Sequence, residues 1–138
     1  MEGCSIHRGT IGASILQGLT VLIVDDHRDT VDMMLEYLAA SGAIVVGAAN
    51  AKAAPEVTTT HLLDAVLVDL RMPREDGRWF LRELRASQTA SANVPVFAVS
   101  GERHDRLDPQ SGFAGYFVKP VDLEALVSVL SALSRRPH

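Results

Sequence analysis

The segment from 64 to 73, DAVLVDLRMP, places the strongest constraint on how this chain can fold. An apolar run over 65–68 leads directly to one carboxylate, Asp69, and a turn with Pro73 and then Gly77 follows. A short run that is apolar on both faces is typical of a strand in a parallel sheet covered by helices on both sides. In such sheets, ligands bind at the carboxyl ends of the strands. We therefore expect Asp69 at the end of a buried strand, in a position suited to chemistry.

Strand and helix patterns alternate along the rest of the chain. Further apolar runs predict strands at 20–24, 43–49, 94–99 and 114–118. Apolar residues at helical spacing predict the intervening helices: one capped by Asp29 and followed by Gly42, one within 50–63, one over 77–87, and one after Asp122. The helix within 50–63 should be short or irregular, because this segment contains Pro55 and three consecutive threonines. The alternation predicts an α/β three-layer sandwich, with a five-stranded parallel sheet and helices on both faces.

The length of the chain is that of one ordinary domain. It has 138 residues, of which 47% are hydrophobic and 22% are charged. We assign residues 19–138 to the domain and residues 1–18, which are rich in Gly, Ser and Thr, to an N-terminal extension. The spacing of Ile11, Ile15, Leu16 and Leu19 is compatible with one short amphipathic turn docked on the domain, and equally with no such turn.

Charge and hydropathy narrow the possible partners. A formal net charge of -4 argues against a nucleic-acid groove or an anionic membrane surface. No apolar run approaches the ~20 residues of a membrane span, and no leader pattern opens the chain, so a cytoplasmic location is expected. One cysteine, Cys4, excludes an internal disulfide. The 5 histidines are scattered without the spacing of a helical metal site, and we interpret them as structural or solvent-exposed.

Polar residues follow the predicted strands and should meet at one edge of the sheet. They are Asp25 with Asp26, Asp69, Ser100 and Lys119. Three carboxylates in one pocket repel one another unless a cation is present, and a hard divalent ion such as Mg²⁺ is the natural counter-ion. An ammonium and a hydroxyl beside a metal-bound carboxylate suit a phosphoryl oxyanion. The pocket is thus predicted to let Asp69 accept a phosphoryl group.

Four motifs in this pattern resemble one known family. VDDH at 24–27, VDLRMPREDG at 68–77, VSG at 99–101 and GYFVKP at 115–120 resemble the receiver domain of two-component response regulators. The resemblance spans roughly residues 19–134 and all predicted strands. It implies a flavodoxin-like sheet with strand order 2-1-3-4-5.

The resemblance also implies roles for individual residues at the metal site. Asp69 matches the phosphoacceptor. Asp26, Asp69 and the main-chain carbonyl of Arg71 match the direct ligands of Mg²⁺ or Mn²⁺, and Asp25 matches a ligand that acts through water.

Other matched positions concern the phosphoryl group and the response to it. Lys119 is similar to the lysine that pairs with the phosphoryl group, and a cis Lys119-Pro120 bond is implied. Ser100 is similar to the switch hydroxyl and Tyr116 to the aromatic that changes rotamer with it. The alternative is that Tyr116 is a half-buried packing residue that does not switch.

The segment between Ser100 and Gly112 departs from the family pattern. It is shorter than usual and contains Asp108-Pro109, so the fourth helix of the fold should be short or irregular. This segment also contains Glu102, which with Arg71 is expected to flank the mouth of the pocket, where the two opposite charges could pair across the opening. Receivers commonly use the face formed by the fourth helix for dimerisation and docking, so a homodimer is possible but not specified.

We expect a phosphoacceptor that takes phosphate from a histidine kinase or a histidine phosphotransfer protein and signals by conformational change. It would be a single-domain regulator or the receiver piece of a hybrid kinase. It would not be an enzyme beyond catalysing its own phosphorylation and dephosphorylation. The main alternative is a pseudo-receiver, an interaction module that works without phosphorylation. A magnesium-dependent phosphatase ranks last, because Arg71 stands where such an enzyme has a second Asp.

Overall fold

The computed structural model describes residues 6–7, 15–101 and 111–134. Within these residues the chain forms one six-stranded sheet in the order β1-β3-β2-β4-β5-β6. The strands are β1 (Ile6–His7), β2 (Thr20–Val24), β3 (Ile44–Ala48), β4 (Ala65–Asp69), β5 (Val96–Ser100) and β6 (Gly115–Val118). The helices are α1 (Arg28–Ala40), α2 (Ala54–Thr60), α3 (Gly77–Ala86) and α4 (Leu123–Ser134). None of these helices is long and apolar enough to cross a membrane.

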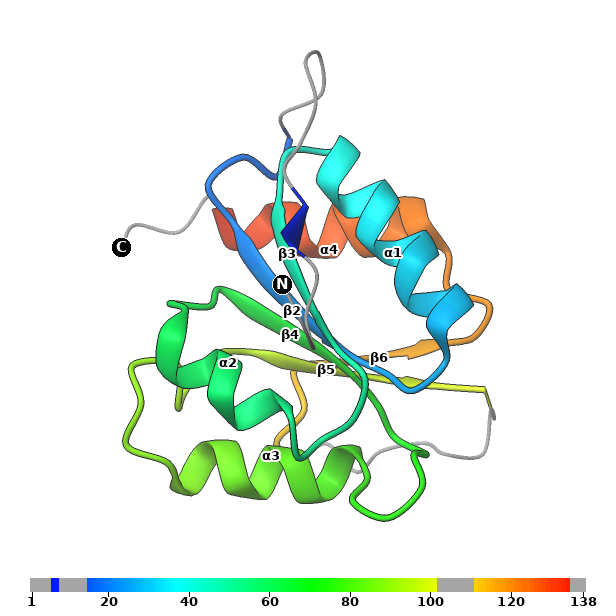
Figure 1. The fold of residues 1–138 in the computed structure, drawn as a ribbon. Coiled ribbons are helices and arrows are strands. Elements are labelled where there is room, and N and C mark those ends of the chain that lie inside the picture. The colour runs from blue at the N-terminus through cyan, green and yellow to red at the C-terminus, as the bar shows by residue number, and fades with distance from the viewer. Residues whose placement is uncertain (1–5, 8–14, 102–110, 135–138) are drawn as a thin grey trace.

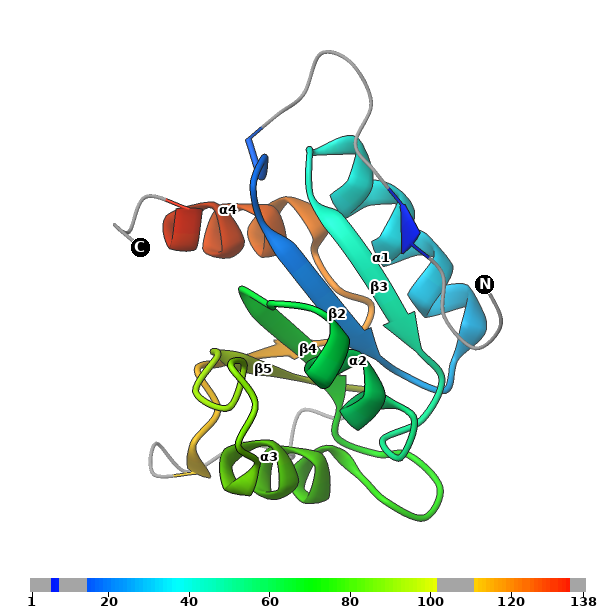
Figure 2. The same cartoon turned by 60° about the vertical axis from the view of Figure 1, so that its left-hand side comes forward.

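The predicted parallel sheet is confirmed. Strands β3, β2, β4, β5 and β6 pair in parallel, and this order is the predicted 2-1-3-4-5. The short strand β1 was not predicted; it pairs antiparallel with β3, with Ile6 opposite Val46, at the edge of the sheet (Figure 2). Most of the predicted fourth helix, at 102–110, lies outside the described residues.

The helices form the two outer layers of the sandwich. Helices α1 and α4 lie on one face of the sheet, and α2 and α3 lie on the other (Figure 1). The predicted apolar stripes point inward: Met34, Leu35 and Leu38 of α1 and Phe80 of α3 are buried. Strands β4 and β5 are buried along their whole length, because both of their faces are covered.

Helix α1 begins earlier than the sequence pattern predicted. Its N-cap is His27 rather than Asp29, which lies in the first turn. The reason is local: the Asp25 carboxylate accepts a hydrogen bond from the His27 amide at 2.8 Å, and this turn carries the chain from β2 straight into the helix. Gly42 follows the helix with a φ of 106°, a conformation that glycine adopts without strain.

Helix α2 is short, as predicted. It has 7 residues and ends in the run of threonines. The hydroxyls of Thr58, Thr59 and Thr60 each donate to a main-chain carbonyl three or four residues earlier. Threonine has a low helix propensity and such bonds tend to bend a helix, so this run weakens the C-terminal end of α2.

The N-terminal extension contributes to the core. Leu16 is fully buried, and its amide donates to the carbonyl of Ser41 at 2.7 Å. Ile15, its neighbour, is 55% exposed. A short turn therefore docks at 15–18 through Leu16, whereas Ile11 lies outside the described residues.

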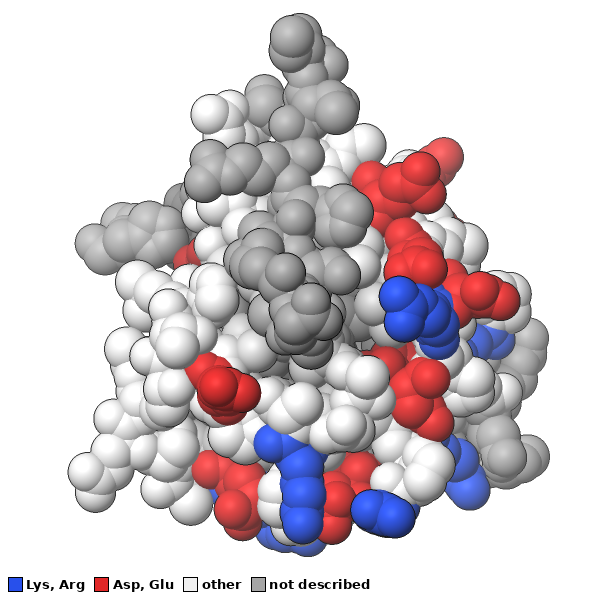
Figure 3. Space-filling view, viewed as in Figure 1, with Lys and Arg blue, Asp and Glu red and all other residues white. Residues whose placement is uncertain are grey.

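The visible surface carries an uneven charge distribution. On the face shown in Figure 3, acidic side chains gather over α1, whose Asp29, Asp32 and Glu36 are exposed. Charges of both signs lie over α3 at the foot of the same view.

Candidate functional site

The polar residues at the strand ends meet at one edge of the sheet, as predicted. Asp25 follows β2 directly, Asp69 and Ser100 are the last residues of β4 and β5, and Lys119 follows β6. The parallel register places these ends side by side, with Asp69 opposite Val99 and Ser100 opposite Val118. The fold thus brings residues that are 94 positions apart in the sequence (119 minus 25) into one site.

Lys119 joins the two buried carboxylates of the site. Its Nζ lies 3.0 Å from Asp25 Oδ2 and 3.1 Å from Asp69 Oδ2. The side chains of Asp25 and Asp69 are only 1% and 3% exposed. Burial lowers the pKa of Lys119, but the contacts with the two carboxylates outweigh this, and its pKa is raised overall. Lys119 therefore stays a cation at the centre of the site.

Asp69 is the carboxylate whose ionisation the site opposes. Burial raises the pKa of Asp69 above its ordinary value, and the nearby Asp25 charge acts in the same direction. The amide of Arg71, which donates to Asp69 Oδ1 at 3.1 Å, and the Lys119 ammonium act against this rise. The carboxylates of Asp25, Asp26 and Asp69 thus carry more negative charge than Lys119 alone neutralises.

The donor set fits a hard divalent cation. Ligand atoms of Asp25, Asp26, His27 and Asp69 all lie within 4.8 Å of one another. Asp25 Oδ2 is buried and makes no hydrogen bond with a described residue, and its contact with Lys119 is an ion pair outside hydrogen-bond geometry. A buried carboxylate oxygen without a hydrogen bond, beside two further carboxylates, is well suited to bind Mg²⁺ or Mn²⁺.

His27 belongs to this site, although the sequence analysis gave it no part there. Its Nδ1 lies 3.1 Å from Asp25 Oδ1, 3.2 Å from Asp26 Oδ1 and 3.5 Å from Asp69 Oδ2. The side chain is 62% exposed, so the imidazole lies at the open side of the pocket. The only sequence signal was its place directly after the acidic pair in VDDH.

Gly77 allows α3 to start directly against the strand end that carries Asp69. A Cβ at position 77 would lie 2.7 Å from the main-chain oxygen of Asp69 and 3.2 Å from Leu70 Cα. Real Cβ atoms essentially never approach another atom so closely. Next to it, the Asp76 carboxylate caps the helix by accepting the Trp79 amide at 2.9 Å. The glycine therefore fixes how closely α3 approaches the site.

The remaining predicted site residues lie in different environments. Ser100 is fully buried, and its carbonyl accepts the Lys119 amide at 2.7 Å. Tyr116 lies in β6 and is partly buried, and Arg71 is exposed. The Lys119-Pro120 bond is cis, as predicted. Glu102 lies outside the described residues, so its pairing with Arg71 stays a prediction.

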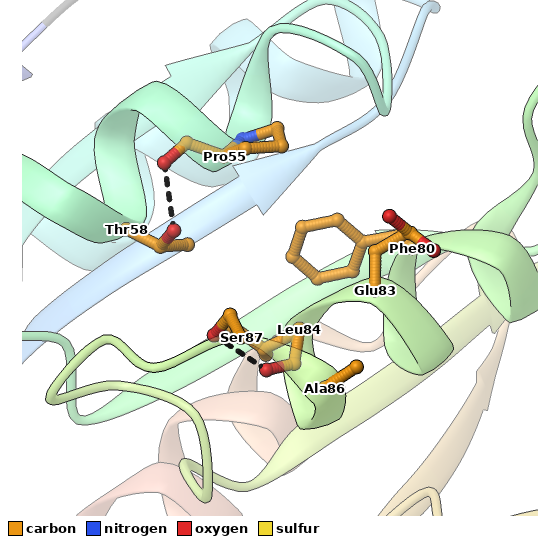
Figure 4. A pocket seen from close by; sticks show the side chains of 7 residues that line it. All are labelled: Pro55, Thr58, Phe80, Glu83, Leu84, Ala86 and Ser87. Atoms are coloured by element: carbon orange, nitrogen blue, oxygen red, sulfur yellow. Dashed lines mark hydrogen bonds between the residues drawn. The ribbon is translucent and has the colours of Figure 1, made fainter.

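A hollow between α2 and α3 is separate from the site at the strand ends. It has a volume of about 260 Å³ and contains none of the strand-end polar residues (Figure 4). Its lining residues are Pro55, Thr58, Phe80, Glu83, Leu84, Ala86 and Ser87. Since Glu83 is its single charged side chain, this hollow lacks the groups for phosphoryl chemistry.

Comparison with known proteins supports the resemblance found in the motifs. Residues 21–131 match the sequence profile of the response regulator receiver domain. The chain is 30% identical over 123 residues to the regulatory protein VirG of Agrobacterium tumefaciens (strain 15955), a match that covers 86% of this chain and 45% of VirG. The chain thus spans about half the length of that relative. It is also 34% identical over 118 residues to an uncharacterized 14.6 kDa protein in the sodA1 3′ region of Leptolyngbya boryana, covering 83% of this chain and 89% of that protein.

A solved structure has the same fold. It is the receiver domain of the sensor histidine kinase PA1611 from Pseudomonas aeruginosa PAO1, with a magnesium ion coordinated in its active site cleft. Its TM-score against this chain is 0.74 at 28% identity, and the match covers 84% of this chain and 97% of that one.

Proposed function

This chain belongs to the response regulator receiver domain family, and we propose that it is a phosphoacceptor in which Asp69 takes a phosphoryl group from a phosphohistidine. The observation that carries the proposal is the position of Asp69. It is a buried carboxylate at the end of a central strand, 3.1 Å from the ammonium of Lys119. The carboxylates of Asp25 and Asp26 complete a site for a cation beside it.

The proposed reaction is a single transfer between two side chains. A carboxylate oxygen of Asp69 forms a bond to phosphorus while the bond from phosphorus to the imidazole nitrogen of the donor histidine breaks. The electron pair of the broken bond stays on the imidazole. Lys119 is positioned to pair with the phosphoryl oxygens, because its Nζ already contacts the oxygen of Asp69 at 3.1 Å.

Asp25, Asp26 and Asp69, with the carbonyl of Arg71, would hold Mg²⁺ or Mn²⁺ in this site. When bound, such an ion neutralises charge on the carboxylates and on the phosphoryl group. The raised pKa of Asp69 supports this assignment, because the pocket opposes further negative charge unless a cation is present. The magnesium ion in the related PA1611 receiver domain points the same way.

The signal would leave the site through Ser100 and Tyr116. Ser100 ends the strand next to β4, and a phosphoryl group on Asp69 offers its hydroxyl a new hydrogen-bond acceptor. Tyr116 lies on the neighbouring strand β6, opposite Ala98 of β5, and would change rotamer with the hydroxyl. Both roles rest on the family resemblance together with these strand positions.

The proposed partners are a histidine kinase or a histidine phosphotransfer protein and a downstream protein that recognises the phosphorylated form. The chain would act on no substrate other than its own Asp69, and it would do so in the cytoplasm. It would work alone or as part of a longer regulator or hybrid kinase, and it spans about half the length of VirG.

The test is incubation with a small phosphodonor and Mg²⁺, followed by intact-mass analysis. We expect one added phosphoryl group on the wild type and none on Asp69→Asn. Asp32→Asn is a matched control, because Asp32 is an exposed carboxylate on α1, and it should be labelled like the wild type. Failure to label the wild type would instead favour the pseudo-receiver, and labelling of Asp69→Asn would remove Asp69 as the acceptor.

A further inference from the structure

The imidazole of His27 faces the same point as the carboxylates of the cation site. Its Nδ1 lies 3.1–3.5 Å from one oxygen each of Asp25, Asp26 and Asp69. These four atoms are close enough together to bind one ion. We propose that His27 is an additional ligand of the divalent cation and shifts the preference of the site from Mg²⁺ towards borderline transition-metal ions such as Co²⁺.

The main chain holds His27 at the site. The His27 amide donates to Asp25 Oδ1 at 2.8 Å, and the residue forms the N-cap of α1. The residue that carries the imidazole is therefore tied to a carboxylate of the cation site, so little ordering is needed to bring Nδ1 to the ion.

Nδ1 lies between three carboxylates and an ammonium, so it has a partner in either tautomer. With its proton on Nδ1, the ring donates to Asp25 Oδ1 at 3.1 Å. Nδ1 lies 3.3 Å from the ammonium of Lys119. In the tautomer with its proton on Nε2, Nδ1 accepts a hydrogen bond from that ammonium. The same lone pair is what a metal ion needs, and the 62% exposure of the side chain leaves the ring free to adjust to an ion arriving from solvent.

Mg²⁺ and Co²⁺ differ in how strongly they prefer an imidazole nitrogen such as His27 Nδ1 as a ligand. Mg²⁺ prefers oxygen ligands, and an imidazole in place of a water adds little to its binding. Affinity for first-row ions rises from Mn²⁺ to Co²⁺ and beyond, and imidazole suits the later ions. Removal of His27 should therefore weaken Co²⁺ binding and leave Mg²⁺ binding almost unchanged.

The experiment is calorimetric titration of the metal-free protein with Co²⁺ and, separately, with Mg²⁺. We expect His27→Asn to raise the Kd for Co²⁺ roughly tenfold or more and to change the Kd for Mg²⁺ less than about twofold. The visible absorption spectrum of bound Co²⁺ should also change in this variant, because a nitrogen ligand is lost. His61→Asn is the matched control, since it removes an imidazole at the end of α2, and it should change neither Kd.

The inference rests on the proposed function, and its failure can be told apart from failure of that function. If Mg²⁺ and Co²⁺ both bind and His27→Asn alters neither the ratio of their Kd values nor the Co²⁺ spectrum, the role of His27 is overturned while the cation site stands. If neither ion binds the wild type, or if binding survives Asp26→Ala unchanged, both the cation site and the role of His27 are overturned.

Discussion

Gly77→Ala should disturb the site by steric contact alone. The new Cβ would lie 2.7 Å from the main-chain oxygen of Asp69, and because this neighbour is backbone, it cannot rotate away. Overpacking of this kind costs about 1–3 kcal/mol. Alanine recovers about 0.4–1 kcal/mol, because it restricts the unfolded chain. We therefore expect a net loss of roughly 1–2 kcal/mol, or a melting temperature lower by about 3–10 °C for a chain of this size.

The same substitution should slow phosphorylation. Either α3 or the end of β4 must move, and a shift of about 1 Å at a reacting group can cost about a hundredfold in rate. The assay combines thermal unfolding with the rate of labelling by a small phosphodonor. Gly101→Ala is the control, because no described heavy atom lies within 4 Å of its Cβ, and it should unfold at or slightly above the wild-type temperature. If Gly77→Ala matches Gly101→Ala in stability and is labelled at the wild-type rate, the close approach of α3 to Asp69 has no functional importance.

Three further predictions concern charges at the site. Burial raises the pKa of Asp69 in the folded protein above its ordinary 3.8. The contribution of Asp69 to the stability of the metal-free protein is therefore lost as pH rises from the ordinary pKa through the raised one. In urea unfolding with chelator, Asp69→Asn should therefore be more stable than the wild type, and the difference should be larger at about pH 7 than at about pH 4. An equal difference at both pH values would contradict burial as the cause of the raised Asp69 pKa. Lys119→Met should destabilise the metal-free protein by roughly 1–3 kcal/mol. Removing one partner of a fully buried ion pair costs ~3–5 kcal/mol, and the cost is lower here because the lysine side chain is 17% exposed. Unchanged urea midpoints would refute this. Arg71→Ala should alter the autodephosphorylation half-life severalfold with little change in melting temperature, because the expected exposed ion pair with Glu102 is worth only ~0–1 kcal/mol. Identical half-lives would exclude a role for Arg71 at the pocket mouth.

The sheet and the meeting of its polar strand ends were predictable from the sequence, because both follow from periodicity. A run such as 65–68 is typical of a strand that is buried on both faces in a covered parallel sheet. Parallel strands place their carboxyl ends at one edge, so Asp25, Asp69 and Lys119 had to come close together once the strands were recognised. The inward faces of the helices followed from apolar spacing in the same way.

What the sequence analysis missed depends on tertiary contacts. Strand β1 has only 2 residues, too few for a period to show, and pairing with the edge of β3 defines it. The guanidinium of Arg85 donates to the carbonyls of Ala92 and Val94 at 2.9 and 2.8 Å, which ties α3 to the segment before β5. The place of His27 in the cation site depends on the turn that Asp25 forms with the His27 amide, which moves the start of α1. None of these contacts leaves a periodic pattern in the sequence.

The most direct test of the account is to locate the phosphoryl group itself. The phosphorylated protein would be treated with borohydride, which reduces an aspartyl phosphate to homoserine, and digested for peptide mapping. We expect homoserine at position 69 and at no other carboxylate, in a yield that matches the phosphoryl group seen by intact mass. Homoserine at position 25 or 26, or a phosphoryl group that survives on another side chain while Asp69 is unmodified, would contradict it.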